Sequence, residues 1–192
     1  MEALESKQTS EYIAEQLAEQ ILTGEIPGGS PLRQEELATQ LGISRIPVRE
    51  ALQILQSQGL IQRLSTRRMI SAEVTPEKLR QTFAVIARME LAGLQSIAQA
   101  GKLPAFQEAV SRSGSEELSL HLLLARETPN EYLQVLLSNA CAYYLGCALR
   151  HTTSSGETYR RLLLADAPKE TEWLAHFSTL AEALIAGREE NR

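Results

Sequence analysis

The 192-residue sequence contains few of the residues on which several common chemistries depend. Asp166 is the only aspartate among 24 acidic residues, which argues against aspartate-rich calcium loops, two-metal nuclease sites and aspartyl dyads. The two cysteines, Cys141 and Cys147, are six residues apart in an apolar run that is expected to be helical. This spacing places them on different faces of one helix. We therefore expect reduced thiols that are buried as small hydrophobic residues.

Long apolar runs are also missing, because no segment approaches the ~20 consecutive apolar residues that a membrane span requires. The first residues, Met-Glu-Ala-Leu-Glu, are acidic and polar, unlike a signal peptide. The sequence offers no nucleophile–base pair, no phosphate-cradling loop and no metal motif with four firm ligands. We therefore expect a cytoplasmic protein that is not an enzyme and does not enter a membrane.

The charge is unevenly distributed. The net charge of −5 is a weak argument against nucleic-acid binding, but residues 1–30 carry one lysine and six glutamates. Residues 31–70 carry six arginines against three glutamates. Because phosphates respond to the local potential, residues 31–70 are the candidate nucleic-acid surface.

The N-terminal segment predicts three helices followed by a β-hairpin. The helices cover about residues 10–23, 33–41 and 45–58, and the strands cover residues 60–64 and 69–74. Gly42 suits the sharp turn between the second and third helices, because glycine tolerates positive φ. The pattern predicts a winged helix-turn-helix domain over residues 1–74.

From Thr75-Pro76, a cap residue followed by proline at the first helical position, the sequence predicts only helices. They cover about residues 76–100, 103–111, 115–127, 130–150, 156–165 and 168–187. The expected fold class is therefore mainly α, with an N-terminal winged helix-turn-helix and a C-terminal all-α helical bundle over residues 75–192. We expect the second domain to serve effector binding and dimerisation.

The third helix has the layout of a DNA recognition helix. Ser44 is its candidate N-cap, and Arg45 and Arg49 lie one turn apart on the face opposite the apolar residues. A helix fits the major groove, where arginine pairs bidentately with guanine O6 and N7. Arg33 begins the second helix and Arg67 lies at the wing tip, where each would contact phosphates or a groove. A single arginine is often only a solvated surface charge, but four on three neighbouring elements favour DNA binding.

Three stretches carry a family resemblance: Pro27-Gly-Gly-Ser-Pro-Leu, Glu36–Leu52 and Gln58-Gly-Leu-Ile. Together they resemble the N-terminal domain of GntR-family transcription regulators, over about residues 10–72. Ile46 replaces the usual threonine, which removes a hydroxyl and offers contact with a thymine methyl group. Arg68 stands where a wing glycine is usual, so the wing contact is either lost or charged. The resemblance implies a homodimer that binds double-stranded DNA at a pseudo-palindromic operator.

The C-terminal half resembles the FadR-type (FCD) ligand domain of that family, beginning with Arg88-Met-Glu90. In that family an arginine at this position often faces the ligand cavity, so Arg88 is the candidate effector-binding residue. The alternative for Arg88 is an ion pair within or between helices. The resemblance implies a repressor that responds to a small organic acid or sugar acid.

The same resemblance implies a divalent metal, zinc or similar. Glu117-Leu-Ser-Leu-His121 resembles the start of the family's metal site, and side chains at i and i+4 share one helix face. His176 resembles a third ligand, and the fourth would lie beyond residue 192, as if the ligand domain were shortened. His151 is a substitute candidate. The alternative is a degenerate site whose histidines lie on helix surfaces.

Two further interpretations remain open. Leucine-rich stretches at 133–137 and 162–164 exceed what one buried helix face needs, which favours a dimer surface. A winged helix can also serve as a protein–protein interaction module without DNA binding, since fold does not fix function. The acidic first helix and the missing wing glycine are compatible with that alternative.

Overall fold

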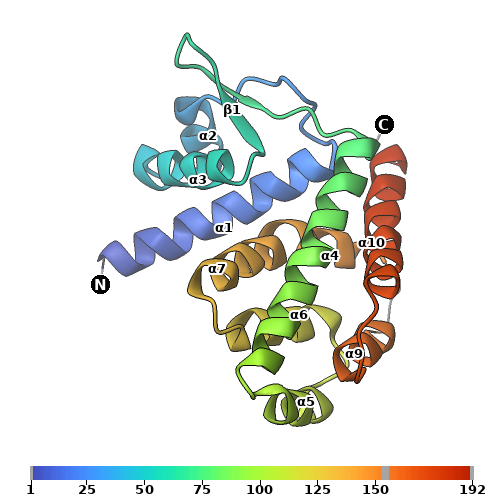
Figure 1. Cartoon of the computed structure of the whole chain (residues 1–192). Coiled ribbons are helices and arrows are strands. Elements are labelled where there is room, and N and C mark those ends of the chain that lie inside the picture. Colours follow the sequence, from blue (N-terminus) through green and yellow to red (C-terminus); the bar gives the residue numbers. More distant parts are fainter. Residues whose placement is uncertain (1, 153–155, 191–192) are drawn as a thin grey trace. The chain divides into compact units, whose positions relative to one another are not determined.

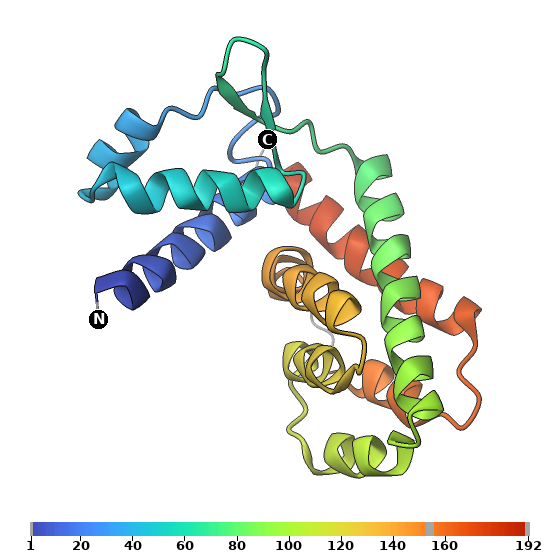
Figure 2. The same cartoon turned by 60° about the vertical axis from the view of Figure 1, so that its left-hand side comes forward.

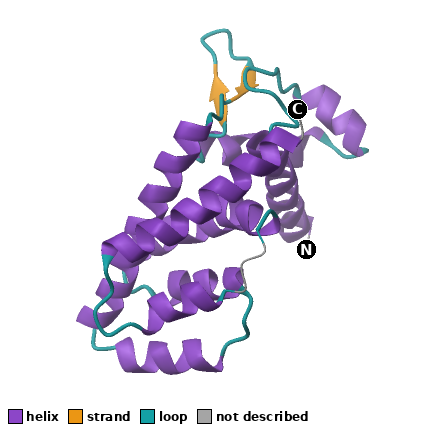
Figure 3. Ribbon diagram, turned by 90° about the vertical axis from the view of Figure 1, so that its right-hand side faces the viewer, coloured by secondary structure: helices purple, strands orange, loops and turns teal. Residues whose placement is uncertain are grey.

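The computed structural model describes residues 2–152 and 156–190. The chain forms two compact units, which are described separately below: residues 2–75 with 188–190, and Pro76–Gly187. Helices dominate both units, and the strands of the described residues form one two-stranded sheet (Figure 3). This confirms the prediction of a mainly α fold with an N-terminal winged helix-turn-helix. None of the described helices combines the length and hydropathy needed to cross a bilayer.

The N-terminal unit is built on three helices, α1 (Glu2–Thr23), α2 (Gln34–Leu41) and α3 (Arg45–Ser57) (Figure 1). Helix α1 begins earlier than the predicted residue 10 and packs along α3. The apolar residues that repeat every turn of α1 are buried, as are those of α3. They are Ile13, Leu17 and Ile21 on α1, and Val48, Leu52 and Leu55 on α3. This shared apolar seam holds α3 in place and leaves its opposite face exposed.

The turn between α2 and α3 depends on Gly42, which has a left-handed φ of 66°. Its N–H donates to the carbonyl oxygens of Ala38 and Thr39, which ends α2. A side chain at this φ would be strained, so glycine is required by conformation rather than by space. Leu41, which the periodicity predicts to face inward, is 49% exposed, because α2 is short and buries only Ala38 fully.

The wing consists of β1 (Ile61–Arg63) and β2 (Met69–Ser71), which are shorter than the predicted strands. They pair antiparallel, with Ile61 opposite Ser71. Pro31 forms an isolated bridge to Ile70, which ties the loop before α2 to the wing. Buried Leu60 and Ile61 anchor the base of the hairpin, so the wing stands beside α3.

The second unit is all-helical over its described residues. Its helices are α4 (Pro76–Gln99), α5 (Leu103–Arg112), α6 (Glu117–Glu127), α7 (Glu131–Ala140), the π-helical turn η1 (Cys141–Leu145), α8 (Gly146–Arg150), α9 (Glu157–Leu164) and α10 (Glu170–Glu190). The six predicted helices therefore correspond to the observed ones, with one interruption. The π-helical turn divides the long helix expected over residues 130–150 into α7 and α8.

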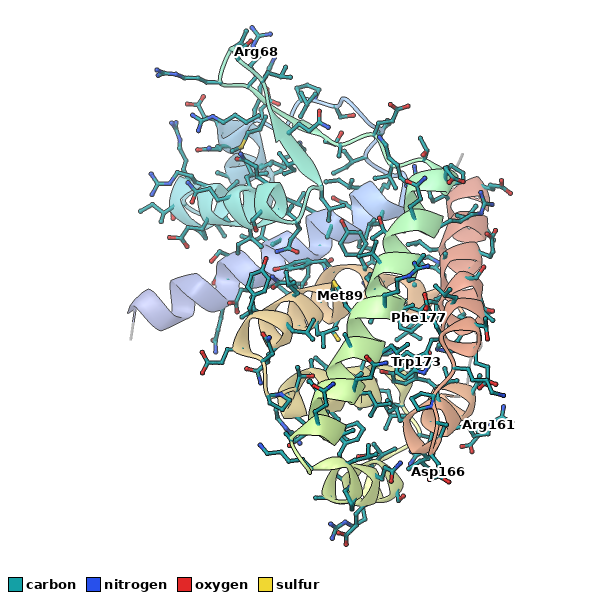
Figure 4. All side chains as sticks on the ribbon, viewed as in Figure 1. Arg68, Met89, Arg161, Asp166, Trp173 and Phe177 are labelled. Carbon is teal, nitrogen blue, oxygen red and sulfur yellow. The ribbon has the colours of Figure 1, made fainter. Side chains whose placement is uncertain are left out.

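Helices α4 and α10 run antiparallel, side by side (Figure 2). Arg80 pairs with Glu182 and Arg88 with Glu170, which fixes their direction. Trp173 and Phe177 lie on the side of α10 toward α4, and both are fully buried (Figure 4). The two cysteines are buried and unbridged, as predicted.

Candidate DNA interface and candidate metal centre

The arginines of residues 31–70 come together in one groove of the N-terminal unit. The groove has a volume of about 550 Å³ and lies between the start of α2, the exposed face of α3 and the wing. Its lining residues are Pro31, Leu32, Arg33, Gln34, Glu35, Arg45, Arg49, Gln53, Arg63, Arg67, Arg68 and Met69. We call this surface the arginine groove. All six arginines that the charge count singled out line it, so the positive charge is concentrated on one face.

The helical arginines project from the first turns of α2 and α3. Arg33 is the N-cap residue of α2, and its NH1 lies 2.5 Å from Glu36 Oε1. Arg45 is the first residue of α3, and its NH1 lies 2.7 Å from Glu35 Oε1. Arg49 follows one turn later on the exposed face. The start of a recognition helix is the part that enters deepest into a major groove, so this placement suits base contact.

Two uncharged residues mark the beginning of α3. Ser44 is its N-cap, with extended backbone, but the hydroxyl makes no capping hydrogen bond. Ile46 is 55% exposed, whereas the next residues, Pro47 and Val48, are buried. A large apolar side chain at this place gains by covering an apolar group such as a thymine methyl.

The wing tip has one unusual backbone feature. Arg67 has a φ of 64°, the only positive φ among the described residues other than glycine. Its N–H donates to the Leu64 carbonyl, which closes the tip, and the Leu64 N–H donates to the Arg68 carbonyl. Figure 4 shows Arg68 at this tip. The family resemblance drew attention to a glycine missing at 68, but the left-handed conformation that glycine favours belongs to Arg67.

In the second unit, the three predicted metal ligands converge. Glu117 and His121 lie on α6 and His176 on α10. Glu117 Oε1 is 2.7 Å from His176 Nε2 and 3.6 Å from His121 Nε2. One ligand atom from each residue lies within 4.8 Å of the others, and all three residues are buried. The histidines are therefore core residues, contrary to the alternative that placed them on helix surfaces.

Two further residues belong to this acid–histidine cluster, and sequence reasoning gave neither a role. Glu90 of α4 is 1% exposed, and its Oε1 lies 2.7 Å from His121 Nδ1. The Tyr159 hydroxyl donates to Glu90 Oε2 at 2.6 Å, and its ring stacks on His121 with centroids 3.8 Å apart. Glu90 is part of the Arg88-Met-Glu90 motif, but the motif does not indicate these contacts. They form only because α4 and α9 pack against α6.

The cluster attracts positive charge. Burial by itself lowers the pKa of His121, but the carboxylates of Glu90 and Glu117 outweigh it and raise that pKa to about 9. Burial and the neighbouring Glu90 raise the pKa of Tyr159 well above its usual value, so its hydroxyl stays protonated. Two buried carboxyl groups and two buried imidazoles therefore meet in one cluster. The two imidazole nitrogens and the carboxylate oxygen suit zinc or a similar ion.

Two residues predicted for the effector or metal site lie elsewhere. Arg88 is half exposed, and its guanidinium donates to Glu170 Oε1 at 2.9 Å and to the Ala84 carbonyl. This is the interhelical ion pair that the sequence left as the alternative, and it turns the side chain toward the surface. His151, the substitute ligand, is exposed at the end of α8.

A second groove, also of about 550 Å³, lies between α9 and α10. Arg161 and Thr158 line it from α9, and Thr179 lines it from α10. His176 of the acid–histidine cluster also contributes to its lining. This groove therefore borders the cluster at His176, and no pattern in the sequence indicated it.

Known proteins resemble this chain in sequence and in fold. Residues 9–69 match the family described as "Bacterial regulatory proteins, gntR family". An HTH-type transcriptional regulator in an unstable DNA locus of Streptomyces ambofaciens is 30% identical over 110 residues, which are 54% of this chain and 45% of that protein. The gluconate operon transcriptional repressor of Bacillus subtilis is 24% identical over 151 residues, 71% of this chain and 62% of the repressor. The chain thus matches less than two thirds of either relative's length.

Among solved structures, E. coli McbR/YncC has a TM-score of 0.52 and 20% sequence identity, covering 95% of this chain and 98% of that one. This similarity concerns the fold, and it extends over both units. The family match coincides with the arginine groove, because residues 9–69 include most of α1, all of α2, α3 and β1, and the wing tip. The residues that form the arginine groove are therefore similar in sequence to bacterial regulatory proteins of the gntR type.

Proposed function

We propose that this protein is a sequence-specific DNA-binding transcription regulator that acts as a homodimer on a pseudo-palindromic operator. The observation that carries the proposal is the arginine groove, which gathers six arginines from the starts of α2 and α3 and from the wing. Arg45 and Arg49 would contact bases in the major groove, with Ser44 and Ile46 beside them. Arg33, Arg67 and Arg68 would contact phosphates or the minor groove.

The salt dependence of DNA affinity tests this proposal against the alternative of a protein–protein module. Phosphate contacts release counterions, so the logarithm of the affinity should fall steeply with the logarithm of the salt concentration. Fluorescence anisotropy with duplexes selected from a random pool measures both the slope and the preference for one sequence. A flat response with no selected sequence would overturn the DNA-binding proposal and favour the protein–protein module.

The second unit would add regulation by a small organic acid or sugar acid, most simply by relieving repression. Support comes from the groove between α9 and α10, where Arg161 offers a charged, multidentate partner for a carboxylate. Arg88 already pairs with Glu170 at the surface. Thermal-shift screening of carboxylates with Arg161→Ala and Arg88→Ala variants separates the two sites. A stabilising acid whose effect survives Arg161→Ala would exclude the α9–α10 groove, and loss in Arg88→Ala would restore the sequence-based assignment.

We also propose that Glu117, His121 and His176 bind a divalent metal, and that the ion stabilises the helical unit and polarises groups in the adjoining groove. The composition of the cluster supports this, because one carboxylate and two imidazoles converge within reach of a single ion, and a second carboxylate lies beside His121. Elemental analysis of protein purified without chelator, beside a His121→Ala variant, tests the site. Metal near zero in both proteins after incubation with zinc would overturn it.

The homodimer has support in the second unit, where α6 and α7 expose several apolar side chains. Tyr132 is 75% exposed, Val135 56% and Leu122 47%. A C2 dimer would place two recognition helices about one turn of DNA apart. Sedimentation equilibrium of the full chain measures this state, and a monomer at concentrations where the operator is bound would contradict it.

A further inference from the structure

Glu35 is an acidic residue within the arginine groove. Its Oε1 lies 2.7 Å from Arg45 NH1, and the two side chains are 71% and 67% exposed. Ion pairs this exposed contribute little to folding stability. A carboxylate among six arginines also weakens the attraction for phosphates. Neither stability nor phosphate binding accounts for a glutamate at this place.

Helix capping does not account for it either. A negative charge in the first turn of α2 favours the helix dipole, but Glu36, the next residue, supplies that charge as well. Glu36 pairs with Arg33, whereas Glu35 reaches across to α3 and pairs with Arg45. The residue that sequence reasoning assigned to base contact is therefore held by a carboxylate from the neighbouring helix.

The fold keeps these two groups in register. Glu35 lies in the first turn of α2, and Arg45 is the first residue of α3. The two helices pack together through the turn at Gly42, so the pair is placed by the backbone of the helix-turn-helix rather than by a loop. In the lining of the groove, the pair presents guanidinium donors beside a carboxylate acceptor.

This pattern is complementary to one base pair. In the major groove, guanine offers the acceptors N7 and O6, and the paired cytosine offers the amino donor N4. Arginine donates bidentately to guanine, and glutamate accepts from cytosine N4. An A·T pair offers the acceptor N7 and the donor N6 on adenine, and the acceptor O4 on thymine. A guanidinium donor would then face the N6 donor and the carboxylate would face O4, which leaves both unsatisfied.

We propose that Arg45 and Glu35 act together to recognise a single G·C base pair in each half-site, with Arg45 donating to guanine and Glu35 accepting from N4 of the paired cytosine. This inference rests on the proposed function of the arginine groove in DNA binding. Glu35 thereby lowers affinity for DNA in general and raises discrimination at one position.

The test begins by locating the base pair. Duplexes selected from a random pool by the wild-type chain and by Arg45→Ala define the position whose preference depends on Arg45. Anisotropy titrations then compare all four base pairs at that position for wild type, Glu35→Ala and the matched control Glu36→Ala. We expect Glu35→Ala to reduce discrimination at this position by about tenfold, the size of one good base contact.

Removing charge alone has a different signature. Glu36→Ala should raise affinity for every duplex by a similar factor and leave discrimination unchanged. Glu35→Ala should also raise affinity for unrelated DNA, while its preference at the Arg45-dependent position falls. Circular dichroism and thermal unfolding verify that both variants remain folded, so that a lost preference reports on recognition.

A chemical substitution in the DNA isolates the proposed contact. Replacing the cytosine by 2-pyrimidinone removes the N4 amino group, and we expect wild type to lose about tenfold in affinity relative to the natural pair. Glu35→Ala should lose much less. The inference is overturned if Glu35→Ala keeps the wild-type ratio at this position or changes the preference at a different one. A wild-type chain that selects no sequence instead overturns the proposed function.

Discussion

Replacing Arg45 and Arg49 together by alanine should abolish sequence-specific DNA binding. Both side chains project from the start of α3, whose opposite face is buried against α1. The double variant removes two guanidinium groups without touching the buried seam of α3. We therefore expect the fold to persist while recognition is lost.

The structure gives the expected magnitude. Six arginines line the groove, and the four besides Arg45 and Arg49 are left for phosphate contacts, so one protomer should show a log–log salt slope of about −3.6, since each phosphate contact contributes about −0.9. Raising the salt from about 50 to about 200 mM would then weaken wild type and the double variant alike, by about 150-fold. At constant salt, two lost guanine contacts, each ~1–3 kcal/mol, predict a loss of at least about 30-fold on the selected site.

Fluorescence anisotropy over a salt series measures both quantities. The matched control is Arg112→Ala/Arg126→Ala, which lowers the net charge of −5 by the same two units at exposed positions of the second unit. The control should bind the selected duplex as wild type does. If the Arg45/Arg49 variant binds the selected duplex within about twofold of wild type, the assignment of α3 as the recognition helix is refuted.

Three further changes have defined outcomes. Arg67→Gly should leave the melting temperature nearly unchanged, because relief of the left-handed conformation, about 1 kcal/mol, is offset by the flexibility of glycine in the unfolded chain. The salt slope of DNA binding should shrink by about 0.9. An unchanged slope would show that Arg67 does not contact DNA. Glu90→Gln should lower the free energy of unfolding by about 3 kcal/mol in a urea titration, because it breaks the buried pair with His121. A decrease of less than about 1 kcal/mol would contradict that pairing. Gly156→Ala should lower the free energy of unfolding by at least about 2 kcal/mol in the same assay, because its φ is +70° and a Cβ atom would lie 2.4 Å from the Ser115 carbonyl oxygen. Wild-type stability of this variant would show that the backbone relaxes freely around the contact.

The helices could be predicted because their signals are local. Apolar residues recur every three or four positions in α1 and α3, and Thr75-Pro76 marks the start of α4. The predictions were less accurate where tertiary contacts decide. Leu41 is exposed because α2 is too short to bury it, and the predicted helix over 130–150 contains a π-helical turn that periodicity does not reveal.

The candidate sites show the same difference. Arg33, Arg45 and Arg49 could be named from the sequence because they occupy the starts of adjacent helices in a short, ordered motif. Glu35 lies in the same motif, but its role depends on the side chain reaching Arg45 across the turn. The pairing of Glu117 with His121 follows from i, i+4 spacing, whereas Glu90 and Tyr159 join them from helices distant in sequence.

The sequence by itself determined the order of the elements, the winged helix-turn-helix and the concentration of arginine in residues 31–70, because capping, periodicity and local charge operate over a few residues. Only the tertiary structure decided that the six arginines share one groove, that Glu35 faces Arg45, and that Arg88 points to the surface. It also decided that two carboxylates and two histidines meet in a buried core. Such meetings depend on how separate helices pack, and no local pattern along the chain records that packing.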